Sequence, residues 1–241
     1  MIRRLAYRLL HGRAQSYHQA HVICLPGHGI AYIRVPKAAN SSIKSALAQR
    51  FGIRARGADT VAQDGFWDDT EDGLAMRLTP ERFVTEGHAA RCWTFSFVRH
   101  PVARLYSCWN NKVIENDALS PRFVAMGVRP GMPFAEFVQA VAETPDDRAD
   151  IHVHSQSGIL EYQGRLVPDF VGRVENIAAD WPCVAERIEA RSGVAMGRLG
   201  ARNMRMGTPA TVALTLPEKV RTLIIDRYRR DVDLFYPDQL S

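Results

Sequence analysis

A lysine followed by a run of small side chains is the first feature of the chain that could do chemistry. The run reads PKAANSS, and after Pro36 it comprises Lys37, Ala38, Ala39, Asn40, Ser41 and Ser42. Residues 30–35 before it are β-formers, and residues 43–51 after it have helical spacing. Such a loop points backbone N–H groups at an anion, and small side chains let the anion approach. The run is predicted to hold a phosphate, although an incidental strand–helix turn would look the same.

The order of residues differs from that of the nucleotide-triphosphatase loop. That loop reads GxxxxGK[ST], with its lysine after the glycines. Here Lys37 precedes the small residues, and the run contains no glycine. No obvious aspartate at a strand end offers itself to Mg²⁺ either. The pattern weighs against an ATP- and Mg²⁺-dependent kinase, which stays open as an alternative.

A second cation follows another expected strand. The segment FVRHPVARLYS, residues 97–107, places Arg99 at the end of that strand and Ser107 on the helix that Pro101 begins. Open α/β sheets bind ligands at the carboxyl ends of their strands. Arg99 is therefore predicted to reach an anion, to which Ser107 returns. Alternatively, Arg99 pairs with an acidic neighbour and Ser107 is an ordinary helix residue.

Strands followed by helices recur along the chain and must position these residues. Strands are expected at 21–25, 30–35, 92–98 and 169–174, and helices at 43–51, 101–115, 151–160, 177–191, 217–230 and from Pro133. The first two strands are separated by PGHG and form a hairpin-like pair. The alternation predicts a single α/β domain over residues 1–241, with a mainly parallel central sheet flanked by helices. Residues 54–80 lack clear periodicity and are predicted to be surface loops.

Positive charge is concentrated near the N-terminus. The net charge is +5, yet the first 58 residues hold ten Lys and Arg and no acidic residue, which leaves 21 basic and 26 acidic residues in the remainder. This distribution is typical of an anion-binding region within the fold, or of a non-enzymatic polyanion-binding protein. The hydrophobic fraction of 46% excludes disordered and collagen-like classes. We predict no nucleic-acid partner.

The first residues form a candidate basic helix. Residues 2–10 place apolar positions at helical spacing opposite three arginines, within an N-terminal extension over residues 1–20. This helix would dock on its own domain or contact a membrane surface peripherally. No run is apolar for the roughly 18 residues of a membrane span, and the start is too short and arginine-rich for a secretory signal. The four cysteines show no CxxC spacing. We expect a cytoplasmic, bacterial protein.

Together, the two anion motifs resemble those of the sulfotransferase family. PKAANSS resembles the 5′-phosphosulfate loop of that family, and FVRHPVARLYS resembles its 3′-phosphate motif. Further matches point to the carbohydrate branch: Gly87-His88, His152 with Gln156, residues 170–176, and Tyr228 with Asp231. The resemblance implies a P-loop-like three-layer fold. It also implies 3′-phosphoadenosine 5′-phosphosulfate as the donor and a hydroxyl group, of a polysaccharide or glycolipid, as the acceptor.

The resemblance also implies roles for individual residues. Residues 37–42 would cradle the 5′-phosphosulfate, and Arg99 with Ser107 would hold the 3′-phosphate. Lys37 would neutralise charge on the bridging oxygen during an in-line transfer. The segment from Arg198 to Arg205 weakly resembles a late loop that closes over the donor. Family loops often carry Thr or Gly where this chain has Ala39 and Asn40. This departure bears on how the donor would be oriented in the loop.

The acceptor hydroxyl needs a base, and His88 is the leading candidate. An imidazole accepts a proton near neutral pH, and the Gly-His position resembles that of the base in some heparan sulfotransferases. Glu86, Glu175 and His152 are alternatives. No cluster of Asp or Cys ligands accompanies His152 and His154, so no metal is predicted.

Overall fold

The computed structural model describes residues 19–71, 73–116, 118–200 and 216–239. The expected basic helix at residues 2–10 therefore lies outside the described residues. The described chain forms two compact units. The sheet unit holds residues 19–100 and 160–200, and the helical unit holds residues 101–159 and 216–239. A single domain over residues 1–241 stays a prediction.

The sheet unit is built on a five-stranded mixed sheet with the order β3-β1-β2-β4-β7. Its strands are β1 (Val22–Leu25), β2 (Ile30–Ile33), β3 (Met76–Leu78), β4 (Trp93–Val98) and β7 (Phe170–Arg173). The predicted hairpin is confirmed, because β1 and β2 are antiparallel. The pairs β2–β4 and β4–β7 are parallel, whereas β3 pairs antiparallel with β1. The α/β class is confirmed, and the sheet is parallel in the half that follows β2.

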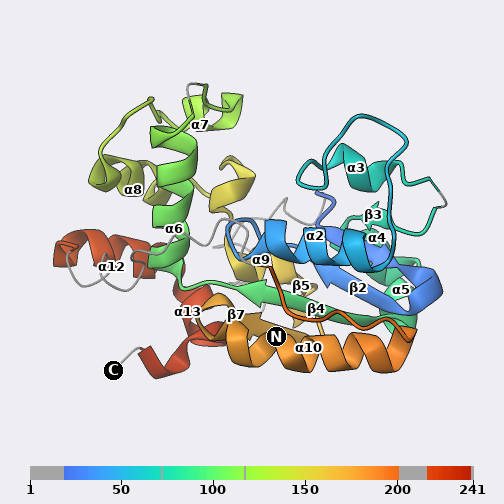
Figure 1. Cartoon of the computed structure of the whole chain (residues 1–241). Helices are drawn as coiled ribbons and strands as arrows, with labels where there is room; N and C mark the ends of the chain where they lie inside the picture. Colours follow the sequence, from blue (N-terminus) through green and yellow to red (C-terminus); the bar gives the residue numbers. More distant parts are fainter. Residues whose placement is uncertain (1–18, 72, 117, 201–215, 240–241) are drawn as a thin grey trace. The chain divides into compact units, whose positions relative to one another are not determined.

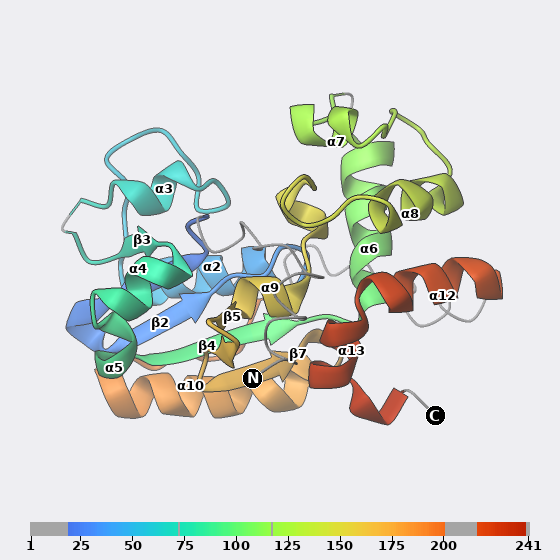
Figure 2. The ribbon, with the colours of Figure 1, turned by 180° about the vertical axis from the view of Figure 1, so that it is seen from behind.

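Helices cover both faces of this sheet (Figures 1 and 2). Alternation along the strands puts Tyr32 beside Phe95 in register, and both rings belong to the buried core. On this face lie α2 (Asn40–Arg50) and α10 (Ile177–Ser192), which add Leu47 and Trp181 to the same core. On the other face lie α4 (Pro80–Thr85) and α5 (His88–Arg91). A small hairpin is formed by β5 (Glu161–Tyr162) and β6 (Arg165–Leu166).

The prediction of surface loops at residues 54–80 is wrong in part. Strand β3 adds an edge to the sheet, and α3 (Gly65–Asp68) buries Trp67 completely. A charge cluster around Asp64 fixes this segment, since Asp64 pairs with Arg34 at 2.8 Å and with Arg77 at 2.9 Å. Arg34 lies 30 positions before Asp64, just after β2, and Arg77 lies on β3, so no local periodicity indicates this pairing.

The helical unit packs α6 (Pro101–Trp109) against α8 (Phe134–Ala142) and α12 (Glu218–Arg227). Its other elements are α7 (Pro121–Ala125), α9 (Gln156–Leu160), whose last residue belongs to the sheet unit, α13 (Arg229–Phe235), the short helical turns η4 (Ile151–Val153) and η6 (Pro237–Gln239), and the π-helical turn η3 (Asn110–Ile114). The helix expected from Pro101 to about Glu115 is thus α6 continued by η3. The helices expected near Pro133 and Pro217 are confirmed as α8 and α12.

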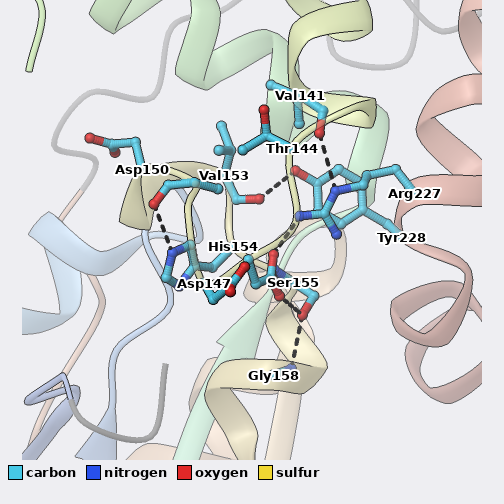
Figure 3. Close-up of polar contacts among 12 residues, drawn as sticks. Val141, Thr144, Asp147, Asp150, Val153, His154, Ser155, Gly158, Arg227 and Tyr228 are labelled. Atoms are coloured by element: carbon cyan, nitrogen blue, oxygen red, sulfur yellow. Dashed lines mark hydrogen bonds and ion pairs between the residues drawn. The ribbon is translucent and has the colours of Figure 1, made fainter. Parts of the chain in front are cut away.

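Polar contacts tie the C-terminal helices to the segment of residues 146–157 (Figure 3). The Arg227 guanidinium pairs with Asp146 at 2.5 Å, and the Tyr228 hydroxyl donates to the Val153 carbonyl at 2.6 Å. The buried Asp231 carboxylate accepts the backbone N–H groups of Gln156 and Ser157 at 2.8 and 2.7 Å. Buried polar groups are stable only when paired, so these contacts hold the segment in one conformation.

Candidate functional site

The carboxyl ends of β2 and β4 bring the two anion motifs to the same edge of the sheet. The strands are parallel, with Ile33 opposite Ser96, and the Ser96 hydroxyl donates to the Ile33 carbonyl at 2.7 Å. The segment of residues 36–42, called here the Lys37 loop, follows β2. Arg99 follows β4 directly. The expectation that both motifs emerge at a carboxyl edge is met by this register.

A direct contact joins the two motifs. One Arg99 guanidinium nitrogen, Nη1, lies 3.4 Å from the backbone carbonyl oxygen of Lys37 and donates to it. The two residues are 62 positions apart in sequence. The arginine side chain thereby lies against the backbone of the Lys37 loop.

The backbone of the Lys37 loop has an uncommon conformation. Lys37 has φ of 67° and Ala39 has φ of 58°, and these are two of the three non-glycine residues with positive φ in the described chain. Each such residue costs roughly 1 kcal/mol relative to an ordinary conformation. Left-handed residues within a turn direct successive N–H groups into one concavity, which binds anions. A turn of this kind usually has glycine at its left-handed positions. Because this loop has none, Lys37 and Ala39 adopt the strained conformation instead.

Helix α2 supplies the second half of the anion site. It spans eleven residues and begins at Asn40, with Ala39 as its N-cap and no acidic side chain in its first turn. No side chain caps its first N–H groups. The positive end of the helix dipole is thus available to an external anion. The Asn40 side-chain oxygen is buried without a hydrogen-bond partner, and as an acceptor it does not itself contribute to anion binding.

Glu175 and His100 occupy the neighbouring position on the same edge. Strand β7 is parallel to β4, and after it the Glu175 carboxylate accepts the backbone N–H of His100 at 2.9 Å. Burial lowers the pKa of His100, and the nearby Glu175 charge opposes that effect. Glu175, an alternative base in the sequence, is thus placed at the edge that carries Arg99.

His88 is not brought to this edge. It begins α5, before β4, whereas Arg99 follows the six residues of β4. At about 3.3 Å per residue, the six residues of β4 separate the end of the strand that follows His88 from the end that precedes Arg99 by roughly 20 Å. The His88 ring stacks on Phe83 with ring centres 6.3 Å apart, and its Nε2 lies 3.6 Å from Glu86. These contacts account for the ring position without a ligand.

Other predicted site residues belong to the helical unit. Ser107 lies on α6, and His152 lies in the turn η4. The Nδ1 of His152 is 2.7 Å from the Asp150 carboxylate, a partner that the sequence analysis did not identify. An aspartate two residues before a histidine at the start of a helical turn is the signal that would have pointed to it.

A cavity of about 520 Å³ runs along α2 in the sheet unit. It starts at Ser42, at the end of the Lys37 loop, and continues past Ser45 and Gln49. Arg50, Arg54 and Arg198 add positive charge to its lining. Its volume is typical of sites for small organic ligands. Of the lining residues, the sequence analysis named only Ser42 and Arg198. The others could not be identified from the sequence, because they follow no distinctive spacing.

Within the described part of the chain, no group of three or more His, Cys, Asp or Glu side chains could hold a metal ion. No helix among those residues has the length and apolar character needed to cross a membrane.

The sheet unit thus combines an α/β sheet with a turn at its carboxyl edge that contains two left-handed residues. The chain belongs to the sulfotransferase family, whose model matches residues 20–237. Carbohydrate sulfotransferase 14 of Danio rerio is 26% identical to it over 240 residues. The match covers 90% of this chain and 62% of the relative. No solved structure matches the chain.

Proposed function

We propose that this protein transfers a sulfuryl group from 3′-phosphoadenosine 5′-phosphosulfate to a hydroxyl group of a carbohydrate. Membership of the sulfotransferase family supports sulfuryl transfer, and similarity to a carbohydrate sulfotransferase supports the acceptor class. The chain spans 62% of that relative, so the acceptor class belongs to the proposal. The observation that carries the donor is the contact between Arg99 and the Lys37 carbonyl, which brings the Arg99 side chain to the backbone of the Lys37 loop.

The residues of the Lys37 loop fit the 5′ end of such a donor. Backbone N–H groups at the start of α2, the left-handed turns at Lys37 and Ala39, and the Lys37 ammonium all favour a doubly anionic group. Arg99, held on the same edge, suits a second phosphate, because a guanidinium offers planar paired donors. The cavity that continues from Ser42 along α2 would receive the nucleoside. Two anionic ends on one nucleotide match two cationic motifs.

Positioning and charge stabilisation would supply most of the rate. The attacking oxygen, the sulfur and the leaving phosphate oxygen must lie in line. Lys37 would stabilise the negative charge that grows on the bridging oxygen as its bond to sulfur breaks. The distance between His88 and this edge gives no support to His88 as the base, whereas Glu175 lies at the edge itself.

A transfer assay tests the proposal. The protein is incubated with radiolabelled donor and a panel of unsulfated polysaccharides, and label in the polysaccharide fraction is measured. We expect transfer, and we expect Lys37→Ala to lower it by at least ~10²-fold, since one donor to the transition state is lost. Arg82→Ala is the matched control, because Arg82 is an exposed cation of α4 paired with Glu86. No transfer to any polysaccharide, or an unchanged rate in Lys37→Ala, would contradict the proposal.

A further inference from the structure

Helix α2 gives the cavity of the sheet unit a polar stripe. Ser42, Ser45 and Gln49 line the cavity, at positions three to four residues apart that share one face of a helix. Gln49 is exposed. At 1.5 Å per residue, it lies roughly 10 Å along α2 from Ser42, where the Lys37 loop ends. The cavity therefore carries a side-chain amide at a distance from that loop.

Apolar side chains form another part of the lining. They include Ile53, Val61 and Phe66, of which Ile53 and Phe66 are buried. Apolar and aromatic groups suit the faces of a planar heterocycle, whose edges then need polar partners. Apolar side chains together with an amide have the chemistry of a nucleobase site.

Asp59 adds a charged acceptor to this lining. Among the described residues that line the cavity, it is the only acidic one, whereas Arg50, Arg54 and Arg198 can only donate hydrogen bonds. The Asp59 carboxylate lies directly against the backbone of Gly65, since a Cβ atom at Gly65 would overlap its Oδ2. Glycine at this position leaves room for the carboxylate.

The segment that carries Asp59 is tied to α2 by hydrogen bonds. Nζ of the buried Lys44 donates to the Ala62 carbonyl at 2.8 Å, and Nε1 of the buried Trp67 donates to the Val61 carbonyl at 3.0 Å. Lys44 belongs to α2, so the helix and this segment are joined beside the cavity. Polar groups on such a fixed frame discriminate between ligands, because they need not be ordered on binding.

We propose that this cavity selects adenine among nucleobases and that Gln49 and Asp59 determine this specificity. The proposal rests on the proposed function, which places the nucleoside of the donor in the cavity. Adenine carries an amino group beside a ring nitrogen, and a glutamine amide accepts from the one and donates to the other. The Asp59 carboxylate accepts the remaining N–H of the amino group. Guanine and hypoxanthine have a carbonyl oxygen at this position, which the carboxylate repels.

Calorimetric titration with two matched ligands tests the specificity. The full chain is titrated with adenosine 3′,5′-bisphosphate and with inosine 3′,5′-bisphosphate, in which a carbonyl oxygen replaces the amino group. We expect the adenosine compound to bind at least ~10-fold more tightly, on the scale of one good bidentate pair.

Two variants assign this preference to the residues. Asp59→Asn should reduce it to about threefold or less, chiefly because the inosine compound binds more tightly once the new amide donates to its carbonyl oxygen. Gln49→Ala should reduce it because the adenosine compound loses a pair of hydrogen bonds. Asp69→Asn is the matched control, since Asp69 is an exposed aspartate that pairs with Arg56 at 3.7 Å and does not line the cavity. A purely structural role of Asp59 would weaken both ligands alike.

The outcomes separate this specificity from the proposed function. Wild-type protein that binds neither bisphosphate would contradict the proposed donor, and the specificity with it. Wild-type protein that binds both within about threefold of each other would overturn the specificity alone. The same holds if Asp59→Asn and Gln49→Ala both keep the wild-type preference.

Discussion

At the scale of single residues, the Lys37 loop places adjacent alanines in different environments. Ala39 has φ of 58° and is the N-cap of α2, whereas Ala38 is fully buried and has no positive φ. A left-handed alanine is strained, and glycine relieves that strain. The two positions therefore form a matched pair in which the same substitution has opposite consequences.

Ala39→Gly should leave the free energy of unfolding unchanged or raise it by up to about 1 kcal/mol, because relief of strain offsets the added chain entropy. Ala38→Gly should lower it by about 1 kcal/mol, since a buried methyl group is lost and flexibility is gained. Urea unfolding measures both values. Equal destabilisation by both substitutions would show that the strain at Ala39 is absent.

The buried Lys44 of α2 provides a pH-dependent test of the charge cluster around Asp64. Burial lowers its pKa from 10.5 to about 8. The positive charges of Arg34 and Arg77 also lower this pKa, whereas the negative charge of Asp64 raises it. Between these pH values the unfolded chain holds a proton that the folded chain has released. The free energy of unfolding should therefore rise with pH in this window, by at most about 1.4 kcal/mol per pH unit.

The Lys44 contribution is isolated by comparison with Lys44→Met, measured by urea unfolding at several pH values from 8 to 10.5. The wild-type protein should gain stability relative to the variant as the pH rises. A constant difference between the two proteins across this range would contradict the assignment.

At the scale of elements, the site depends on the close packing of β4 and β7. Gly172 of β7 lies opposite Phe97 of β4, and a Cβ atom at Gly172 would stand 2.5 Å from the Phe97 ring. Glycine is thus required at this register position by the neighbouring aromatic ring. Arg99 directly follows β4, and Glu175 lies two residues after the end of β7, so the spacing of the two strands sets the geometry of the carboxyl edge.

Gly172→Ala should lower the free energy of unfolding by about 1–3 kcal/mol, because the Phe97 ring must leave its position. Gly27→Ala is the matched control: its φ is not in the left-handed range, and a Cβ atom there would meet nothing within 4 Å. Thermal or urea unfolding compares the two. A cost for Gly172→Ala no larger than that for Gly27→Ala would contradict this account of β7.

The local elements of the site could be predicted because each depends on neighbouring residues. The strand before Lys37, the helix after it and the helix begun by Pro101 all have short-range signals. By contrast, β3 is three residues long and exists through its pairing with β1, which no local pattern encodes. The left-handed turns at Lys37 and Ala39 were also missed, because glycine is the usual signal for them.

At the scale of the whole molecule, the position of Arg99 beside the Lys37 loop could be predicted from the sequence, whereas the position of His88 relative to that loop could not. Parallel strands deliver Arg99 to the Lys37 loop by a general rule of α/β sheets. The choice of His88 rested on its residue type and on resemblance, and residue type does not say which end of a strand a side chain occupies. His152 owes its orientation to Asp150 and to contacts from distant helices, which only the folded chain shows.

The central claim is that the Lys37 loop and Arg99 form one site for a nucleotide with two anionic ends. Calorimetric titration of the full chain with adenosine 3′,5′-bisphosphate, without metal and beside Mg²⁺–ATP, tests it most directly. The account predicts metal-independent binding of the bisphosphate that weakens at least ~10-fold in Arg99→Ala, the scale of a charge-assisted hydrogen bond, and is unchanged in Arg82→Ala. Binding of Mg²⁺–ATP without binding of the bisphosphate, or an Arg99→Ala protein with wild-type affinity, would contradict it.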